Sequence, residues 1–186
     1  MLRLLFLLAL SLLPASAWST TLDDIRAHEP SSRVTWAEQW FYNVAAPGIG
    51  YFKISFQTYI APDSVDGREK AYMHLAFTPL QGATVKYDLF YDEVILAHPT
   101  KEEAFYYEVP GIIVADEERI RVTHEDFRFS LDWDGPHTRY WGGLNPGQTP
   151  FGIIPELPGV GGKWFLYTVT TPVQYSFDDG TLAWSG

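Results

Sequence analysis

The sequence contains no cysteine among its 186 residues. Disulfide bonds, thiol catalysis and cysteine-ligated metal sites are therefore excluded. The sequence also lacks a Gly-x-Ser-x-Gly elbow, a phosphate-binding glycine loop and a dinucleotide fingerprint, so these common catalytic classes have no support. The five histidines are scattered, and none pairs at the spacing of metal ligands. We therefore predict neither a metal site nor a cofactor.

Positively charged residues are also scarce. The chain has 13 lysines and arginines against 23 aspartates and glutamates, which gives a net charge of −10. A surface of this sign repels nucleic acid and anionic lipid headgroups, so we predict no nucleic-acid partner. Acidity alone indicates little beyond solubility.

Long apolar runs are absent except at the start of the chain, where Leu4 to Leu13 follows Arg3 and precedes Ala15-Ser16-Ala17. A positive residue, an apolar run and a small-x-small site together are typical of a secretory signal peptide. The run is too short to span a bilayer, which takes roughly 20 residues. We expect a signal peptide at residues 1–17 and a secreted or periplasmic mature chain at 18–186, with no integral membrane segment.

Aromatic residues are abundant at 16%, and the 13 prolines and 15 glycines argue for many turns and against long helices. Within residues 51–60, Phe52, Ile54 and Phe56 recur with the period of two that a half-buried strand requires. The same alternation appears at residues 127–133. Strands are predicted at residues 39–45, 51–60, 71–78, 85–91, 104–109, 119–123, 127–133, 163–170, 173–177 and 181–184, the last two joined as a hairpin by Asp178-Asp179-Gly180.

About ten short strands in one chain of this length predict a single all-β domain, either an antiparallel barrel or a closed sandwich. Residues 134–162 interrupt the pattern because they are rich in proline and glycine. Long segments of this kind are often binding loops or lids. A loop that plugs one end of a barrel is the alternative, and the sequence does not decide between the two.

His74 is the first candidate for proton transfer. It lies between Met73 and Leu75 in a predicted strand, in phase with Tyr72 and Ala76. If this face lines a cavity, His74 can exchange a proton with a ligand near neutral pH. The alternative is a structural histidine that bonds to a neighbouring strand.

Glu38 is the second candidate, because it begins the first predicted strand beside Trp40 and Tyr42. A carboxylate among aromatic rings can be desolvated and act as an acid. The alternative is a strand-end charge that faces solvent.

Several aromatic side chains are candidates for the wall of an apolar pocket with a few polar groups. Packing in the core is the alternative for each of them. The candidate ligand-binding residues are Trp40, Tyr42, Tyr72, Trp141, Trp164 and Tyr167.

Four segments together resemble one known family. His28-Glu29-Pro30 followed by Glu38-Gln39-Trp40-Phe41-Tyr42 resembles the "H-P … E-W-W-Y" signature of the AttH / hydroxyneurosporene synthase (carotenoid 1,2-hydratase-like) family. Residues 50–56 are similar to its "G-x-x-L-x-F" strand, and residues 72–78 to its "A-H-F-A-L-T/S" segment. Residues 164–173 are similar to its "Y-Y-S-x-P" stretch. The chain departs from the family in having Trp40-Phe41 for the double tryptophan, and in a longer spacer.

The resemblance implies a lipocalin-like barrel, and in the family two such barrels occur in tandem. It also implies export and a hydrophobic, often prenyl-derived, ligand, with hydratase, cyclase or hydrolase-like activity in some members. Protonation of an alkene would suit such chemistry, and Glu38 or His74 could supply the proton. The resemblance covers one barrel, so we expect residues 18–186 to be the first half of a two-barrel protein.

We therefore expect a secreted, lipocalin-like domain that binds a hydrophobic, isoprenoid- or lipid-like small molecule. The residues leave open whether it also catalyses a reaction. A carbohydrate-binding or carbohydrate-active β-sandwich is the main alternative, with Trp141 and Trp164 as stacking platforms and Glu38 and Asp132 as acids. A structural domain without a ligand is the third interpretation.

Overall fold

The computed structural model describes residues 27, 36–60, 68–100, 105–135 and 171–186. These residues form ten β-strands and no helix, which confirms the predicted all-β class. No helix in this part of the chain has the length and apolar character needed to cross a membrane. The expected signal peptide (residues 1–17), the predicted strand at 163–170 and nearly all of the loop at 134–162 lie outside the described residues.

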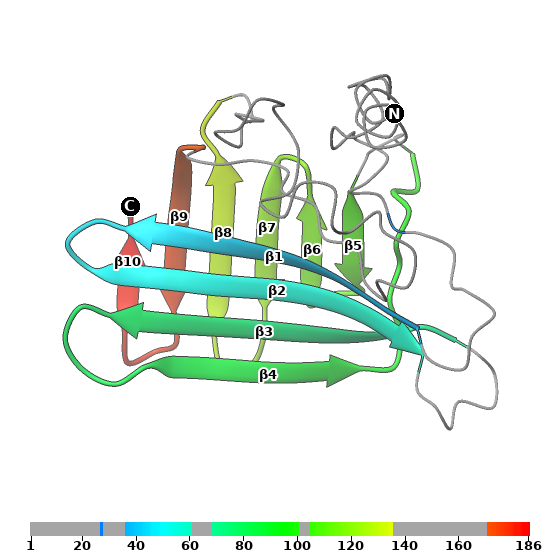
Figure 1. Cartoon of the computed structure of the whole chain (residues 1–186), viewed down its shortest axis with the longest axis horizontal. Helices are drawn as coiled ribbons and strands as arrows, with labels where there is room; N and C mark the ends of the chain where they lie inside the picture. Colours follow the sequence, from blue (N-terminus) through cyan, green and yellow to red (C-terminus); the bar gives the residue numbers. More distant parts are fainter. Residues whose placement is uncertain (1–26, 28–35, 61–67, 101–104, 136–170) are drawn as a thin grey trace, which may run out of the picture. The chain divides into compact units, whose positions relative to one another are not determined.

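The strands form two antiparallel sheets in which each strand pairs with its neighbours in the chain (Figure 1). The first sheet has the order β1-β2-β3-β4, and the second has the order β10-β9-β8-β7-β6-β5. The strands of the first sheet are β1 (Trp36–Ala46), β2 (Gly50–Ile60), β3 (Lys70–Pro79) and β4 (Val85–Tyr91). Those of the second are β5 (Tyr106–Val109), β6 (Ile113–Asp116), β7 (Arg119–Thr123), β8 (Arg128–Trp133), β9 (Val173–Asp178) and β10 (Ala183–Ser185).

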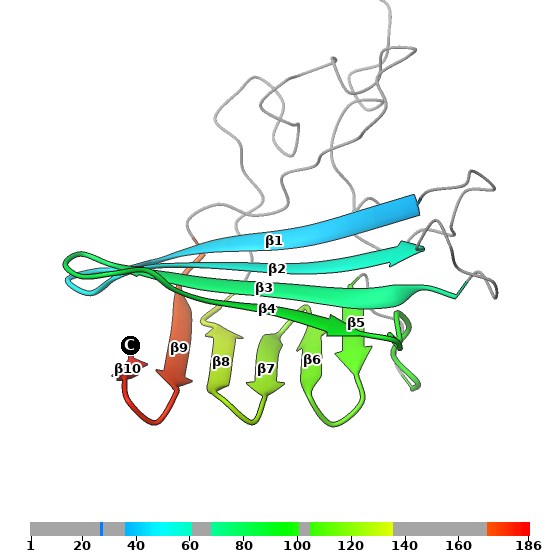
Figure 2. The same ribbon diagram turned by 90° about the horizontal axis from the view of Figure 1, so that it is seen from below.

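The two sheets are separate layers that belong to one compact unit, Arg26–Asp134 with Val173–Gly186 (Figure 2). Their strands run across one another in Figure 1. One isolated antiparallel bridge ties the segment between β4 and β5 to the second sheet, where Ile95 and Glu108 of β5 exchange two backbone hydrogen bonds of 2.9 Å. Within the described residues β1 and β10 do not pair, so neither sheet is closed into a barrel. Of the two predicted architectures, a β-sandwich therefore fits the described residues, and a closed barrel does not.

Aromatic and aliphatic side chains fill the space between the layers, as the alternating pattern predicts. Phe52, Ile54 and Phe56 of β2 are 0% exposed, and Phe129 and Leu131 of β8 are nearly as well buried. The Phe52 ring lies 5.7 Å from the Phe129 ring across the two sheets. Such close packing leaves no hollow at this position, and the burial of these side chains is the main force that joins the sheets.

A buried tyrosine adds a polar link between the layers. Tyr107 of β5 is 0% exposed, and its hydroxyl donates a 2.9 Å hydrogen bond to the backbone carbonyl of Gln57 in β2. Because the donor is paired, the tyrosine can be buried at little cost. This bond fixes β5 against the first sheet next to Trp40, whose ring lies 6.2 Å from the Tyr107 ring.

The predicted hairpin between β9 and β10 is confirmed. The carboxylate of Asp179 accepts hydrogen bonds from the backbone amides of Thr181 and Leu182 at 2.9 and 2.7 Å. Gly180 adopts a φ of +80°, a conformation that glycine reaches without steric cost. Strand β6 was not predicted, because Ile112-Ile113-Val114 is a continuous apolar run without the period of two.

Candidate functional site

The inner face of β1 carries an aromatic cluster at one edge of the sandwich. Alternation along β1 directs Trp40 and Tyr42 toward the second layer, where they meet Phe105 and Trp133. The Trp40 and Phe105 rings lie 5.2 Å apart, and the Tyr42 and Trp133 rings 5.5 Å apart. We call these four residues the inner aromatic cluster.

The inner aromatic cluster differs from the rest of the core in its access to solvent. Trp40, Tyr42 and Trp133 are half-buried, whereas Phe105 is buried. On the neighbouring strand every apolar residue from Phe52 to Phe56 that faces inward is 0% exposed. Large rings with accessible surface at the edge of a packed core are typical of a pocket wall for an apolar molecule.

Three polar side chains, Glu38, Thr58 and Tyr91, lie on the same inner face as this cluster. The cross-strand register places Glu38 opposite Thr58, Thr58 opposite Ala71, and Ala71 opposite Tyr91. Glu38 and Tyr91 are half-buried, and the buried hydroxyl oxygen of Tyr91 has no hydrogen-bond partner in the described structure. Burial raises the pKa of Tyr91, so its hydroxyl stays a neutral donor at physiological pH. Sequence reasoning did not select Tyr91, because only the register brings it into line with Glu38.

His74 lies on the opposite, outer face of the first sheet. Its Nδ1 is 2.7 Å from Oδ1 of Asp88, and the Tyr72 hydroxyl donates a 2.6 Å hydrogen bond to the same oxygen. An ionised carboxylate has only acceptors, so Nδ1 of His74 carries the proton in this bond and Nε2 points away from Asp88. The predicted phase of His74 with Tyr72 is confirmed, and Asp88 is the partner that sequence reasoning did not select.

The hydrogen bonds that share Oδ1 of Asp88 shift the pKa values of Asp88 and Tyr72. The hydrogen bonds from Tyr72 and His74 lower the pKa of Asp88 below its ordinary value of 3.8. Burial, together with the bond to Asp88 and its charge, raises the pKa of Tyr72 to about 12. Asp88 is therefore ionised and Tyr72 neutral over the whole physiological range.

The structure does not bring Glu38 and His74 together. Residues of even number face inward on β1 and β2, but residues of odd number face inward on β3 and β4. Glu38 therefore shares the inner face with Trp40 and Tyr42, and His74 shares the outer face with Tyr72. Trp141, Trp164 and Tyr167 lie outside the described residues.

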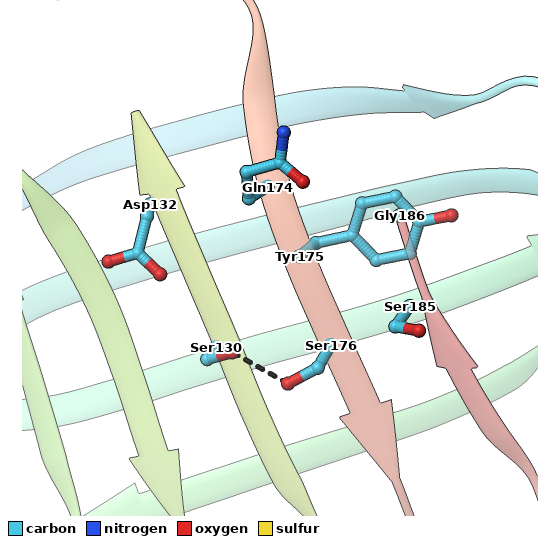
Figure 3. A pocket seen from close by; sticks show the side chains of 7 residues that line it. All are labelled: Ser130, Asp132, Gln174, Tyr175, Ser176, Ser185 and Gly186. Carbon is cyan, nitrogen blue, oxygen red and sulfur yellow. Dashed lines mark hydrogen bonds between the residues drawn. The ribbon is translucent and has the colours of Figure 1, made fainter. Parts of the chain in front are cut away.

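A shallow, open hollow of about 310 Å³ lies on the outer face of the second sheet. Figure 3 shows its lining side chains: Ser130, Asp132, Gln174, Tyr175, Ser176, Ser185 and Gly186. The hydroxyls of Ser130 and Ser176 bond to each other at 2.6 Å, and Asp132 pairs with Arg121. Because these groups already satisfy one another, the hollow is a weaker candidate than the inner aromatic cluster. Asp132 also lies on a different sheet from Glu38, the acid proposed as its counterpart.

One group in the described residues has donor atoms close enough to hold a metal ion, namely His124, Glu125 and Asp126 in the β7–β8 turn. Nδ1 of His124 accepts a hydrogen bond of 3.2 Å from the backbone amide of Asp126. This bond is sufficient to explain the conformation of the turn, and Glu125 and Asp126 are exposed. We therefore assign no metal to the group.

Comparison of the chain with protein families, with curated proteins and with solved structures found no significant match. The assignment of function therefore depends on the residues and their arrangement.

Proposed function

We propose that this chain is an exported, lipocalin-like domain that binds an apolar small molecule against the inner aromatic cluster. The observation that carries the proposal is the contrast in exposure between Trp40, Tyr42 and Trp133 and the fully buried rings of the neighbouring strand. Export is supported by the charged, apolar and small-x-small segments at residues 1–17.

The order of the strands supports the lipocalin-like part of the proposal. Within each sheet the strands follow one another as a meander, β1 to β4 in the first and β5 to β10 in the second. The Ile95–Glu108 bridge ties the connection between β4 and β5 to the second sheet. Up-and-down barrels that hold a small ligand are built from the same succession of nearest-neighbour strands. The order of the four sequence segments quoted above supports membership of the AttH / hydroxyneurosporene synthase family, which is part of the same proposal.

The polar groups on the inner face of the first sheet suit a mostly apolar ligand with a single polar end, long enough to extend from β1 toward β4. The buried Tyr91 hydroxyl can donate to an oxygen of a ligand that reaches it, and so gain the partner that it lacks among the described residues. A hydroxyl, carbonyl or carboxyl group on a lipid or terpenoid would meet this need.

Any proton transfer at this site would fall to Glu38 rather than to His74. Glu38 is on the face of the inner aromatic cluster, whereas His74 is on the far side of the sheet. A carboxyl group on the same face as a bound alkene is the group placed to exchange a proton with it. Hydratase or cyclase chemistry is therefore the reaction class that the inner site best accommodates, if the ligand is a substrate.

The test is the binding of cis-parinaric acid, a fluorescent polyene fatty acid whose emission rises in an apolar site. The mature wild-type protein should bind it saturably. Trp40→Leu should weaken the affinity by about tenfold, because a large interface ring contributes about 1.4 kcal/mol or more. Tyr91→Phe should weaken binding of the acid more than binding of its methyl ester.

The matched control is Phe41→Leu, which changes an aromatic residue on the same strand but on the outer face. It should leave the affinity for cis-parinaric acid unchanged. No saturable emission with the wild-type protein would refute the proposed function. Equal losses in Trp40→Leu and Phe41→Leu would show that the inner aromatic cluster is not the site.

A further inference from the structure

A second group of aromatic and polar side chains lies on the outer face of the first sheet. The register aligns Phe41, Ser55, His74 and Asp88 in one row across the four strands. The adjacent row contains Gln57, Tyr72 and Phe90. We call Phe41, Gln57, Tyr72, His74, Asp88 and Phe90 the outer platform.

Rings lie at two sides of the outer platform. Phe90 on the edge strand β4 is 66% exposed, and Phe41 on the opposite edge strand β1 is 37% exposed. The Tyr72 and Phe90 rings lie 4.7 Å apart at an interplanar angle of 33°. Exposed large rings on a sheet surface, set apart from the core, are typical of binding surfaces.

Hydrogen-bonding groups are held between these rings. Both bonds to Asp88, from Tyr72 and from His74, end on Oδ1. Both lone pairs on Oδ2 of Asp88 therefore remain as acceptors for an external donor, and Nε2 of His74 is a further polar atom beside them. The side chains of His74 and Asp88 are 23% and 43% exposed, so a ligand can reach both. Because Tyr72 and His74 fix the carboxylate, these acceptors need little reorganisation on binding.

The chemistry of the outer platform disfavours lipids, apolar protein surfaces and nucleic acids. A lipid or an apolar protein surface would bury an ionised Asp88 without supplying donors, which is costly. A nucleic acid would bring phosphates to a carboxylate on a chain of net charge −10. A neutral polyhydroxylated molecule meets both requirements, since its hydroxyls donate to the acceptors and its C–H faces pack on the rings.

We propose that the outer platform is a carbohydrate-binding surface that takes neutral sugar chains, separate from the inner aromatic cluster. The sugar lies across the strands between Phe41 and Phe90, and its hydroxyls bond to Asp88 and His74. Such binding would hold an exported domain on a polysaccharide, independently of the small molecule in the inner site.

Affinity electrophoresis tests the proposal in native gels that contain hydroxyethylcellulose, glucomannan or xylan. At least one of these neutral polysaccharides should retard the wild-type protein. Phe90→Ala should weaken the affinity by about tenfold, the factor that corresponds to loss of one strong ring contact. Asp88→Asn should also weaken it, because the amide replaces an acceptor with a donor.

Tyr51→Ala is the matched control, because Tyr51 is 44% exposed on the same face of β2 but lies outside the outer platform. It should leave retardation unchanged, and so should Trp40→Leu. Phe90→Ala should leave binding of cis-parinaric acid unchanged, so the two sites are separable. The proposal is overturned if none of the three polysaccharides retards the wild-type protein. It is also overturned if Tyr51→Ala and Phe90→Ala lose equal affinity, or if Phe90→Ala acts only by dissolving a dimer in light scattering.

Discussion

Replacement of Tyr107 by phenylalanine isolates the polar link between the two sheets. The substitution keeps the buried ring and removes the hydroxyl that donates to the Gln57 carbonyl at 2.9 Å. A neutral hydrogen bond of this kind contributes about 1 kcal/mol to stability. At pH 7 Tyr107→Phe should therefore lower the free energy of unfolding by about 1 kcal/mol and the Tm by about 3 °C.

The same tyrosine should make stability depend on alkaline pH. Burial raises the pKa of Tyr107 above its ordinary value of 10.0. Between the unfolded and the folded pKa the native state binds more protons than the unfolded state, so stability falls as pH rises. The loss approaches about 1.36 kcal/mol per pH unit for one group, and phenylalanine does not share it. The accumulated loss reaches about 1 kcal/mol roughly 0.6 pH units above the unfolded pKa, so the advantage of the wild-type protein over Tyr107→Phe should be gone by pH 11.

Urea unfolding followed by circular dichroism at pH 7, 9, 10 and 11 measures both effects. Tyr51→Phe serves as the control at pH 7, because Tyr51 is exposed and its change should cost less than about 0.5 kcal/mol. If wild type and Tyr107→Phe unfold at the same urea concentration at pH 7, the hydrogen bond does not stabilise the fold. If the difference between them stays constant up to pH 11, the hydroxyl is not buried as the structure has it.

Two further predictions concern turns. Gly50→Ala should destabilise the protein by more than about 3 kcal/mol in urea unfolding, because the new Cβ would collide with the backbone of β3. Gly48→Ala in the same turn meets nothing within 4 Å and should cost only about 1–2 kcal/mol for its φ of +78°; equal losses would contradict the packing. Asp179→Ala should lower the Tm at pH 7 by removing the acceptor for Leu182 and for the Tyr87 hydroxyl. Burial raises the pKa of Asp179, but its hydrogen bonds lower it further, so the folded pKa lies below the ordinary 3.8. The contribution of the ionised group is therefore lost as the pH falls from 3.8 through the folded pKa, and the two proteins should converge over that range; a constant difference would refute the assignment.

Much of the fold could be predicted because the apolar residues alternate. Phe52, Ile54 and Phe56 face the core as their period of two requires, and Phe129 with Leu131 does the same on the second sheet. The hairpin at residues 178–180 followed from turn chemistry alone. In each of these cases the determining residues lie within a few positions of one another in the sequence.

The arrangement of the candidate sites depends on pairing between distant residues, which one sequence does not specify. Asp88 reaches His74 because β3 pairs with β4 in one register, and a shift by one residue would move it to the other face. One signal for the orientation of His74 was present: Met73, Leu75 and Phe77 are the apolar set of β3. That alternation assigns the face of His74 to the outside.

Even-numbered residues face inward on β1 and β2 but odd-numbered residues do so on β3, so Glu38 and His74 lie on opposite faces of the first sheet. A ligand that contacts Glu38 lies on one side of a hydrogen-bonded sheet, and His74 lies on the other. The backbone ladder between them leaves no path by which one small molecule could touch both groups without breaking strand pairing. Proton transfer and sugar binding, if both occur, must therefore be separate events on separate faces. The Trp40→Leu and Phe90→Ala substitutions, one on each face, are sufficient to distinguish the two sites.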